Sequence, residues 1–552
     1  MPYLFFILII VFVFIIVMQS GMTARRKKML DQLKAGWGKP KTDDFNFDEI
    51  GLYTLHNQQP CFHQLTEQTR VDIDFNELFA FVDRSTSHVG QQYLFDRMQK
   101  PGNNIAELKS LSDKARFFTD NVSEREEVQE ILVSLNNSNS YYIAGLLNGK
   151  LAERPKWFRL LIIDTAIVIS MLLLSVKFPV LLIWMMIPFA LNMGLHLWNK
   201  NNTYRFLRSL PQLNKLIHVA DKLTGKQLPF EKEKVMMAIS RLKTFQRKMR
   251  FLSFGQQGMA AELTQVYYYF LELMKAVFLI ELHVFYSIIN ELENKQDAVN
   301  EVFTYVGLID TGMTIASLRA GNPQTCEPEF IDDAKKMQAV KVYHPLIEDC
   351  VTNDLTIASK SILITGSNMS GKTTFLRTIA INSILAQTLY TCFAEVFSAP
   401  ILKLASSIRI DDSVTDGRSY YLEEVDVMSK LIGQIKPDQQ NLFILDEVFK
   451  GTNTIERIAA GKAILSYLNR FNNIVLVSTH DMELSEMLAD EYDLYHFVET
   501  IQDNQLFFDH LLKAGQLKTR NAIKILEMSD YPEATITEAI DISKRIAMTN
   551  IT

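Results

Sequence analysis

The sequence predicts an all-helical region followed by an α/β domain with a parallel sheet, and it adds apolar segments long enough to be transmembrane helices. Residues 70–150 and 200–320 carry apolar and charged side chains at the three-to-four spacing of amphipathic helices. From about residue 337, short β-branched runs alternate with helical patterns, which is typical of an α/β domain. The apolar blocks lie near the N-terminus and at residues 158–198.

Length and composition narrow the functional classes. The chain has 552 residues, and single cores stop growing at roughly 250–300 residues, so more than one domain is expected. Its net charge of -6 excludes an overall basic surface that coats nucleic acid, so any contact with DNA must be local. The 4 cysteines show no CxxC or metal-site spacing, which predicts reduced core residues.

The first apolar block runs from Tyr3 to Met18, and basic residues follow it at 25–28. A cleaved signal peptide is the alternative, but its charges precede the apolar core and it ends in a small-residue cleavage site. We therefore expect an uncleaved anchor at residues 1–21, followed by a linker at residues 22–69.

The second block runs from Phe158 to Trp198 and is interrupted at residues 177–179. It is long enough for two spans of about 18–20 residues joined by a tight turn, and a buried hairpin of a soluble core is the alternative. Basic residues lie on both sides of the block: Lys156, Arg159, Lys200, Arg205 and Arg208. By the positive-inside rule we expect a multi-pass protein of the inner (cytoplasmic) membrane whose α/β domain is cytoplasmic.

A phosphate-binding loop opens the α/β domain. The β-branched run 362–365 leads into G-x-x-x-x-G-K-T and then into a helical pattern. Glycines let backbone N–H groups surround phosphates, Lys372 reaches the β- and γ-phosphates, and the Thr373 hydroxyl binds Mg²⁺. The predicted nucleotide-binding residues are Gly366, Ser367, Asn368, Met369, Ser370, Gly371, Lys372, Thr373 and Thr374.

Two further strand ends complete the predicted ATP site. The buried run 441–446 ends in Asp446, which is expected to hold Mg²⁺, and Glu447, which is expected to act as general base. The run 473–478 leads to His480, which is placed to donate to the γ-phosphate. An ordinary strand exit and a structural histidine are the alternatives for these two motifs. Glu447, His480 and Lys372 form the predicted catalytic set.

These motifs resemble the ATPase of the DNA mismatch-repair MutS family. The resemblance rests on GSNMSGKTT, on DEVFKGTNTIERIAAGKAIL, on STHDMEL and on the VYHPLI entry to the domain. It implies an ABC-type ATPase that uses ATP and Mg²⁺ as a homodimer. The turn with Gly451, Thr452 and Asn453 would cross the dimer interface, and Ser419 would reach the ATP of the partner subunit.

The sequence also departs from the family. Tyr420 and Tyr421 stand where the family usually has Thr and Phe, and Phe449-Lys450 replaces a Gly-Arg pair. The mismatch-reading domain has no room here, and Phe75-Asn76-Glu77 is expected to match its motif by coincidence. Classical mismatch recognition is therefore not expected.

The resulting organisation assigns residues 70–157 to a helical MutS-like core and residues 158–198 to a transmembrane hairpin. Residues 199–330 form a core and lever segment, including an amphipathic core helix from Tyr267 to Ile289. Residues 331–520 form the ATPase and residues 521–552 a C-terminal helical segment.

Two functions fit this predicted domain organisation. The first is a membrane-anchored ATPase coupled to DNA binding, and the alternative is a nucleotide-gated membrane scaffold or motor without DNA. A basic cluster could contact DNA phosphates or anionic lipids, or form an ordinary solvated helix face. Its members are Arg241, Lys243, Arg247, Lys248 and Arg250.

Overall fold

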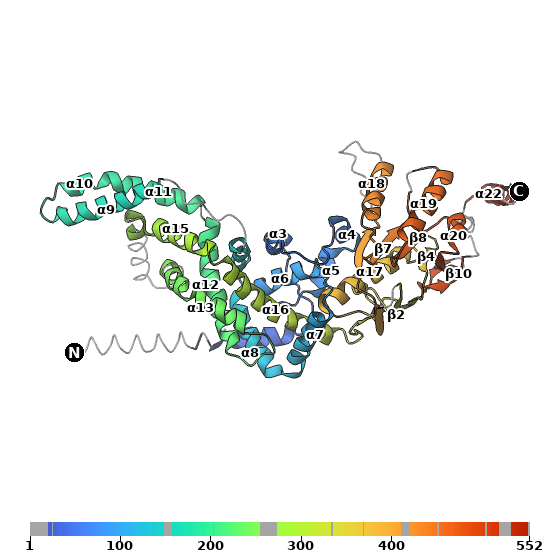
Figure 1. Cartoon of the computed structure of the whole chain (residues 1–552), viewed down its shortest axis with the longest axis horizontal. Helices are drawn as coiled ribbons and strands as arrows, with labels where there is room; N and C mark the ends of the chain where they lie inside the picture. Colours follow the sequence, from blue (N-terminus) through green and yellow to red (C-terminus); the bar gives the residue numbers. More distant parts are fainter. Residues whose placement is uncertain are drawn as a thin grey trace. The chain divides into compact units, whose positions relative to one another are not determined.

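The computed structural model describes residues 20–21, 23–24, 26–147, 157–202, 204–253, 273–332, 335–367, 369–409, 420–449, 452–502, 505–517 and 531–549. The chain forms two compact units. Unit 1 comprises residues 1–60, 82–97 and 111–321, and unit 2 comprises residues 61–81, 98–110 and 322–552. The predicted helical region and α/β domain are both confirmed (Figure 1). The predicted anchor at Tyr3–Met18 lies outside the described residues.

Unit 1 is helical and is organised around α16 (Gln296–Gly321), whose side chains are buried along most of its length. The helices α12 (Tyr204–Thr224) and α13 (Glu233–Ser253) pack against it. On α16, Phe303 stacks on Tyr53 with ring centroids 4.5 Å apart. The other helices include α2 (Phe47–Ile50), α3 (Leu52–His56), α6 (His88–Met98), α7 (Ile105–Asp120), α8 (Val122–Leu132), η1 (Val133–Leu135) and η2 (Ser138–Leu146).

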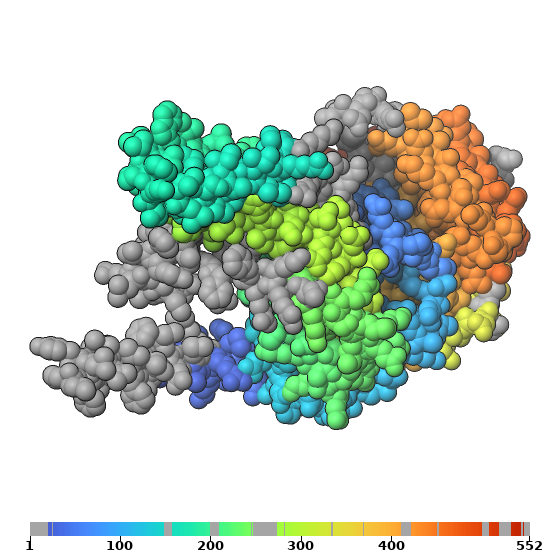
Figure 2. All heavy atoms as spheres, turned by 60° about the vertical axis from the view of Figure 1, so that its left-hand side comes forward, coloured from blue at the N-terminus to red at the C-terminus, as the bar shows by residue number. Residues whose placement is uncertain are grey.

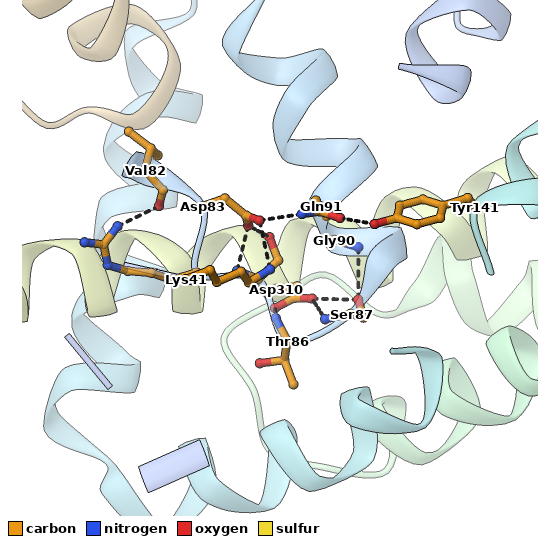
Figure 3. Close-up of polar contacts among 11 residues, drawn as sticks. Lys41, Val82, Asp83, Thr86, Ser87, Gly90, Gln91, Tyr141 and Asp310 are labelled. Atoms are coloured by element: carbon orange, nitrogen blue, oxygen red, sulfur yellow. Dashed lines mark hydrogen bonds and ion pairs between the residues drawn. The ribbon is translucent and has the colours of Figure 1, made fainter. Parts of the chain in front are cut away.

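A fully buried carboxylate joins α16 to the start of α6 (Figure 3). Asp310 accepts hydrogen bonds from the backbone N–H groups of Thr86 and Ser87, both at 2.8 Å, and from Ser87 Oγ at 2.6 Å. It therefore holds the two residues that precede α6, and the Ser87 hydroxyl in turn accepts from Gly90 N at 3.0 Å and caps the helix. Gly90 is required beside it, because a Cβ there would lie 2.1 Å from Asp310 Oδ2.

A second buried carboxylate, Asp83, extends this network (Figure 3). It accepts hydrogen bonds from Ser85 N at 2.8 Å, from Gln91 Nε2 at 2.7 Å and from Lys41 Nζ at 2.8 Å. The Tyr141 hydroxyl donates to Gln91 Oε1 at 2.5 Å. Because each buried charge has several donors, the network specifies one arrangement of these helices.

The 158–198 block folds back on itself, as α9 (Phe158–Ser175) followed by α10 (Leu181–Trp184) and α11 (Met186–Asn202). Within the described residues, Phe158–Ser175 and Leu181–Trp198 are long and apolar enough to cross a membrane. Figures 1 and 2 show this hairpin projecting from unit 1 beside α15 (Ile280–Glu293). Most of its side chains do not pack against the protein: Leu173 and Ile183 are 70% and 72% exposed.

The predicted single helix from Tyr267 to Ile289 is wrong where the structure describes it. Residues 273–277 are helical, but a turn follows, and α15 begins only at Ile280. Leu279 has a φ of +49°, a left-handed conformation that interrupts the helix. The interruption lets α15 pack against the base of the hairpin, where Phe158 contacts His283 and Tyr286.

Unit 2 contains a six-stranded sheet in the order β12-β9-β4-β8-β7-β6. The strands β9, β4, β8, β7 and β6 are parallel, and β12 is an antiparallel edge. The bounds are β4 (Ser361–Thr365), β6 (Lys403–Ser407), β7 (Asn441–Asp446), β8 (Ile474–Thr479), β9 (Tyr492–His496) and β12 (Lys513–Ala514). The carboxyl ends of β4, β7 and β8 therefore meet at one edge of the sheet.

Helices cover both faces of this sheet. On one face, side chains such as Phe443 and Leu445 form a core with α18 (Tyr420–Ile432), α19 (Thr454–Leu468) and α20 (Met482–Leu488). The alternate residues Leu442 and Ile444 point to the other face, and α17 (Lys372–Leu389) also packs on β7. α4 (Glu67–Asp72) and α5 (Phe75–Val82) precede the domain in sequence, and α22 (Glu533–Thr549) follows it.

A second sheet has the order β1-β5-β2-β3, and β10 and β11 form a separate hairpin. The bounds are β1 (Glu329–Phe330), β2 (Met337–Val342), β3 (Asn353–Ile357), β5 (Val396–Ala399), β10 (Glu499–Gln502) and β11 (Gln505–Phe508). All four cysteines are free thiols, but the prediction that they are core residues holds only for Cys392, and Cys61 is exposed.

Candidate functional site

The phosphate loop lies between β4 and α17, as its sequence predicts. Gly366 and Gly371 have φ values of +150° and +112°, and Met369 is left-handed at +69°. The Lys372 ammonium is buried under the loop and donates to the carbonyl oxygens of Gly366 and Ser367, both at 2.8 Å. The loop thus curves around its own lysine, and α17 begins directly at Lys372.

The carboxyl ends of β7 and β8 bring the other predicted residues to this loop. The Thr373 hydroxyl donates to Asp446 Oδ2 at 2.6 Å, and Ser478 Oγ donates to the other carboxylate oxygen of Asp446. A hydroxyl and a carboxylate in direct contact offer the hard oxygen ligands that Mg²⁺ prefers, so these residues fit that ion.

Glu447 and His480 are a contacting pair. Glu447 has a left-handed backbone with φ +54°, its N–H donates to Ser478 O at 3.0 Å, and His480 Nε2 contacts its carboxylate. Asp481, the next residue after His480, forms a bidentate ion pair with Arg457, with N–O distances of 2.9 and 2.7 Å. This pairing with Asp481 raises the pKa of Arg457 and holds the loop after β8 on α19.

A cavity of about 310 Å³ opens above the loop. Lys372, Thr373, Thr374 and Glu447 line it, so the loop lysine and the candidate base face the same space. The lining also includes the apolar side chains of Ile347, Val351, Phe375 and Phe497. A lining with both polar and apolar side chains suits a ligand that carries both phosphates and a planar base.

Sequence reasoning missed several residues of this site. His510 lines the cavity and contacts Ser370 O through Nδ1 at 3.1 Å, and Glu499, which is buried, accepts from Ser367 Oγ at 2.6 Å. Phe497 packs on Phe375 with ring centroids 6.0 Å apart. These residues come from β9, β10 and the loop after β11, and no motif marked that segment. The one available signal was a histidine directly after a short β-rich run.

The residues predicted at the dimer interface are only partly described. Asn368, Ser419 and Gly451 lie outside the described residues. Asn453 is the N-cap of α19 and accepts from Glu456 N at 3.0 Å, and the Thr452 hydroxyl donates to Glu456 Oε2 at 3.2 Å. Asn453 therefore caps α19, and Thr452 binds the side chain of Glu456 in its first turn.

Two of the residues that depart from the family pattern contact each other. Tyr421 on α18 packs against Phe449, which lies three residues after the end of β7, with ring centroids 6.0 Å apart. Phe449 is buried and left-handed, with φ +63°. An aromatic pair thus joins α18 to the turn after β7.

We predict that Gly366→Ala weakens nucleotide binding by roughly 10- to 100-fold, because strain of this kind costs about 1–3 kcal/mol. A Cβ at Gly366 would lie 2.8 Å from Phe497 O and 3.0 Å from Ser370 Oγ. Titration calorimetry with a non-hydrolysable ATP analogue measures the change. Gly433→Ala is the matched control, because its Cβ would meet only carbonyl oxygens at 3.5 Å. Equal affinity of both variants would contradict the prediction.

Comparison with known proteins agrees with this geometry. Residues 362–547 match the family model MutS domain V. The DNA mismatch repair protein MutS of Natronomonas pharaonis is 27% identical over 270 residues, which cover 47% of this chain and 31% of that protein. The protein of the same name from Pseudothermotoga lettingae is 29% identical over 277 residues, covering 48% and 34%. The chain thus spans about a third of the length of these curated relatives.

Proposed function

With residues 362–547 forming a MutS domain V, an ABC-type ATPase, we propose that this chain is a membrane-anchored ATPase that works as a dimer and couples ATP hydrolysis to DNA binding. The observation that carries the ATPase part is the meeting of three strand ends. Thr373 bonds to Asp446, while Lys372 and Glu447 line the same cavity.

In this mechanism the loop N–H groups and Lys372 bind the phosphates, because they supply positive charge on a rigid frame. Thr373 and Asp446 would hold Mg²⁺, which neutralises charge on the phosphate oxygens when bound. Glu447 accepts a proton from the attacking water, and His480 orients the Glu447 carboxylate. The apolar side chains of the cavity lining, such as Ile347 and Val351, would contact the base.

The dimer follows from the resemblance of the segments around Ser419 and Gly451 to parts of the family that face a partner subunit. The proposal of DNA binding rests on the relatives, which are named DNA mismatch repair proteins. Of the predicted basic cluster, the side chains of Arg241 and Lys243 are described, and both are exposed on α13. They offer a local positive surface on a chain whose net charge is negative.

The test of DNA coupling is ATPase turnover of the detergent-solubilised protein with no DNA, matched duplex, mismatched duplex and branched DNA. Stimulation by any DNA, decreasing steeply with salt, supports the proposal, because phosphate contacts release counterions. Equal turnover with and without every DNA would exclude the DNA part. It would leave the alternative, a nucleotide-gated membrane scaffold.

The exposed hairpin supports the proposal that the chain is anchored in a membrane. It is also the observation that favours the alternative function, a nucleotide-gated membrane scaffold. α9 has 18 residues and is therefore about 27 Å long, close to the thickness of a bilayer core. Trp157 and Trp198 lie together at the base of the hairpin, with ring centroids 5.8 Å apart, as in an interfacial aromatic belt. A bilayer would cover the exposed apolar side chains of the hairpin. In a hairpin of a soluble core, the protein itself would cover these side chains.

We predict that lipids brominated along the acyl chain quench the fluorescence of Trp184, which is 59% exposed near the turn end of the Leu181–Trp198 span. Trp184→Phe should reduce the quenching measured in vesicle-reconstituted protein. Trp37→Phe is the control, because Trp37 packs under Arg125 in unit 1. If Trp184→Phe leaves the quenching unchanged, the hairpin does not enter the bilayer.

A further inference from the structure

The turn between α4 and α5 belongs to unit 2 and carries two aspartates that bind the ATPase. Asp72 is fully buried and accepts from Ser406 Oγ at 2.6 Å, from Ile408 N at 3.1 Å and from Arg409 N at 2.8 Å. All three donors lie at the carboxyl end of β6. Asp72 therefore fixes the point where the chain leaves β6 toward residues 410–419.

Asp74 joins this exit to the phosphate-loop helix. Its carboxylate accepts hydrogen bonds from Nη1 and Nη2 of Arg409 at 2.6 and 3.3 Å. The same carboxylate forms an ion pair with Arg377 Nη1 at 3.1 Å. Arg377 lies on α17, one helical turn after the predicted Mg²⁺ ligand Thr373. Arg409 stands ten residues before Ser419 in the sequence. One carboxylate thus holds both the helix that begins at Lys372 and the segment that leads to Ser419.

The geometry makes this link specific. Asp74 is left-handed, with φ +52°, a conformation that Asp and Asn tolerate better than other side chains. The side chain of Arg377 is only 17% exposed, so its charge depends on the Asp74 carboxylate as a partner. Arg409 approaches the carboxylate with both terminal nitrogens, a geometry that fixes direction as well as distance.

We propose that Asp74 is a positioning residue that transmits the nucleotide state of the phosphate loop to the segment bearing Ser419. A shift of α17 on ATP binding moves Arg377, and the shared carboxylate moves Arg409 with it. Because Ser419 serves the partner's nucleotide under the proposed dimeric function, this link makes the two ATP sites cooperative. The inference rests on that proposed function.

A purely structural role, in which Asp74 only docks α4 and α5 onto the domain, makes a different prediction. It lowers thermal stability and lowers all activities in proportion to the folded fraction. A positioning role changes turnover and cooperativity of a protein that is folded and binds nucleotide normally.

The experiment compares Asp74→Asn with wild type in the full-length protein in detergent. Asparagine keeps the left-handed turn and one acceptor oxygen but removes the charge. We expect kcat to fall on the order of tenfold and the Hill coefficient for ATP to fall toward one. Affinity for a non-hydrolysable ATP analogue should change less than about twofold, since none of Asp74, Arg377 and Arg409 lines the cavity. Glu77→Gln, an exposed carboxylate on α5, is the matched control and should behave as wild type.

A double-mutant cycle sharpens the test. Arg409→Gln should give the same loss as Asp74→Asn, and the double variant should be no worse than either single one. Non-cooperative hydrolysis by the wild type, or variants with wild-type kcat and Hill coefficient, would overturn the inference and leave the proposed function intact. Absence of any ATPase activity in the wild type would instead refute the proposed function.

Discussion

Replacing Glu447 by glutamine is expected to lower ATP turnover by roughly 10²- to 10⁴-fold, the usual contribution of a general base. Glutamine has the same shape but cannot accept the proton of the attacking water. Glu447 faces the cavity at the end of β7 and contacts His480. Single-turnover hydrolysis of radiolabelled ATP measures the loss, and filter binding should show that nucleotide is still retained.

The control for this variant is Glu483→Gln, an exposed carboxylate in the first turn of α20. It should keep wild-type turnover. Turnover of Glu447→Gln within about twofold of wild type would assign the base to another residue, since a true general base contributes far more. The Glu447→Gln variant, which should retain ATP without hydrolysing it, also tests DNA coupling. If it stays on DNA only in the ATP-bound state, then ATP binding and DNA binding are coupled.

The second large effect is expected for Asp310→Ala, which should destabilise unit 1 by about 3–5 kcal/mol. Alanine leaves three buried donors without an acceptor, the backbone N–H groups of Thr86 and Ser87 and the Ser87 hydroxyl. Denaturant unfolding in detergent measures the change. Asp310→Asn should cost less, because its amide oxygen still accepts. A loss below about 1 kcal/mol for the alanine variant would contradict this account.

The pH dependence of stability gives an independent check on Asp310. Burial raises the pKa of Asp310 from 3.8 to about 6, against the hydrogen bonds from Ser87 and Thr86, which lower it. The folded state therefore binds this proton more tightly than the unfolded chain, so the stability from this group falls as pH rises from about 4 to about 6. Wild type should lose more stability than Asp310→Asn between these two pH values.

The arrangement of the candidate site could be predicted from the sequence because its residues lie in short contiguous motifs. The residues of the phosphate loop are neighbours in the chain, and a strand before them with a helix after them forces the curved loop. Asp446 and His480 each follow a buried strand, and parallel strands end at one edge of a sheet. Their convergence needs only this topology.

Other predictions failed or stayed incomplete where distant residues decide the outcome. Leu279 interrupts the helix that apolar periodicity predicts as continuous, and α15, which begins directly after it, contacts Phe158 through His283. His510 and Glu499 reach the phosphate loop from segments more than 120 residues away, and no spacing in the sequence indicates that contact.

By itself, the sequence determined the helical region and the α/β domain, the phosphate loop and the strand ends that follow it, and two apolar stretches of bilayer length at residues 158–198. These depend on periodicity, on strand length and on residues adjacent in the chain. Only the tertiary structure decided that Asp310 binds Ser87 across 223 residues and that Asp74 joins Arg377 to Arg409. The physical reason is that a buried carboxylate needs hydrogen-bond donors, and the fold brings these donors from distant parts of the chain. The spacing of residues in the sequence does not indicate which donors they are.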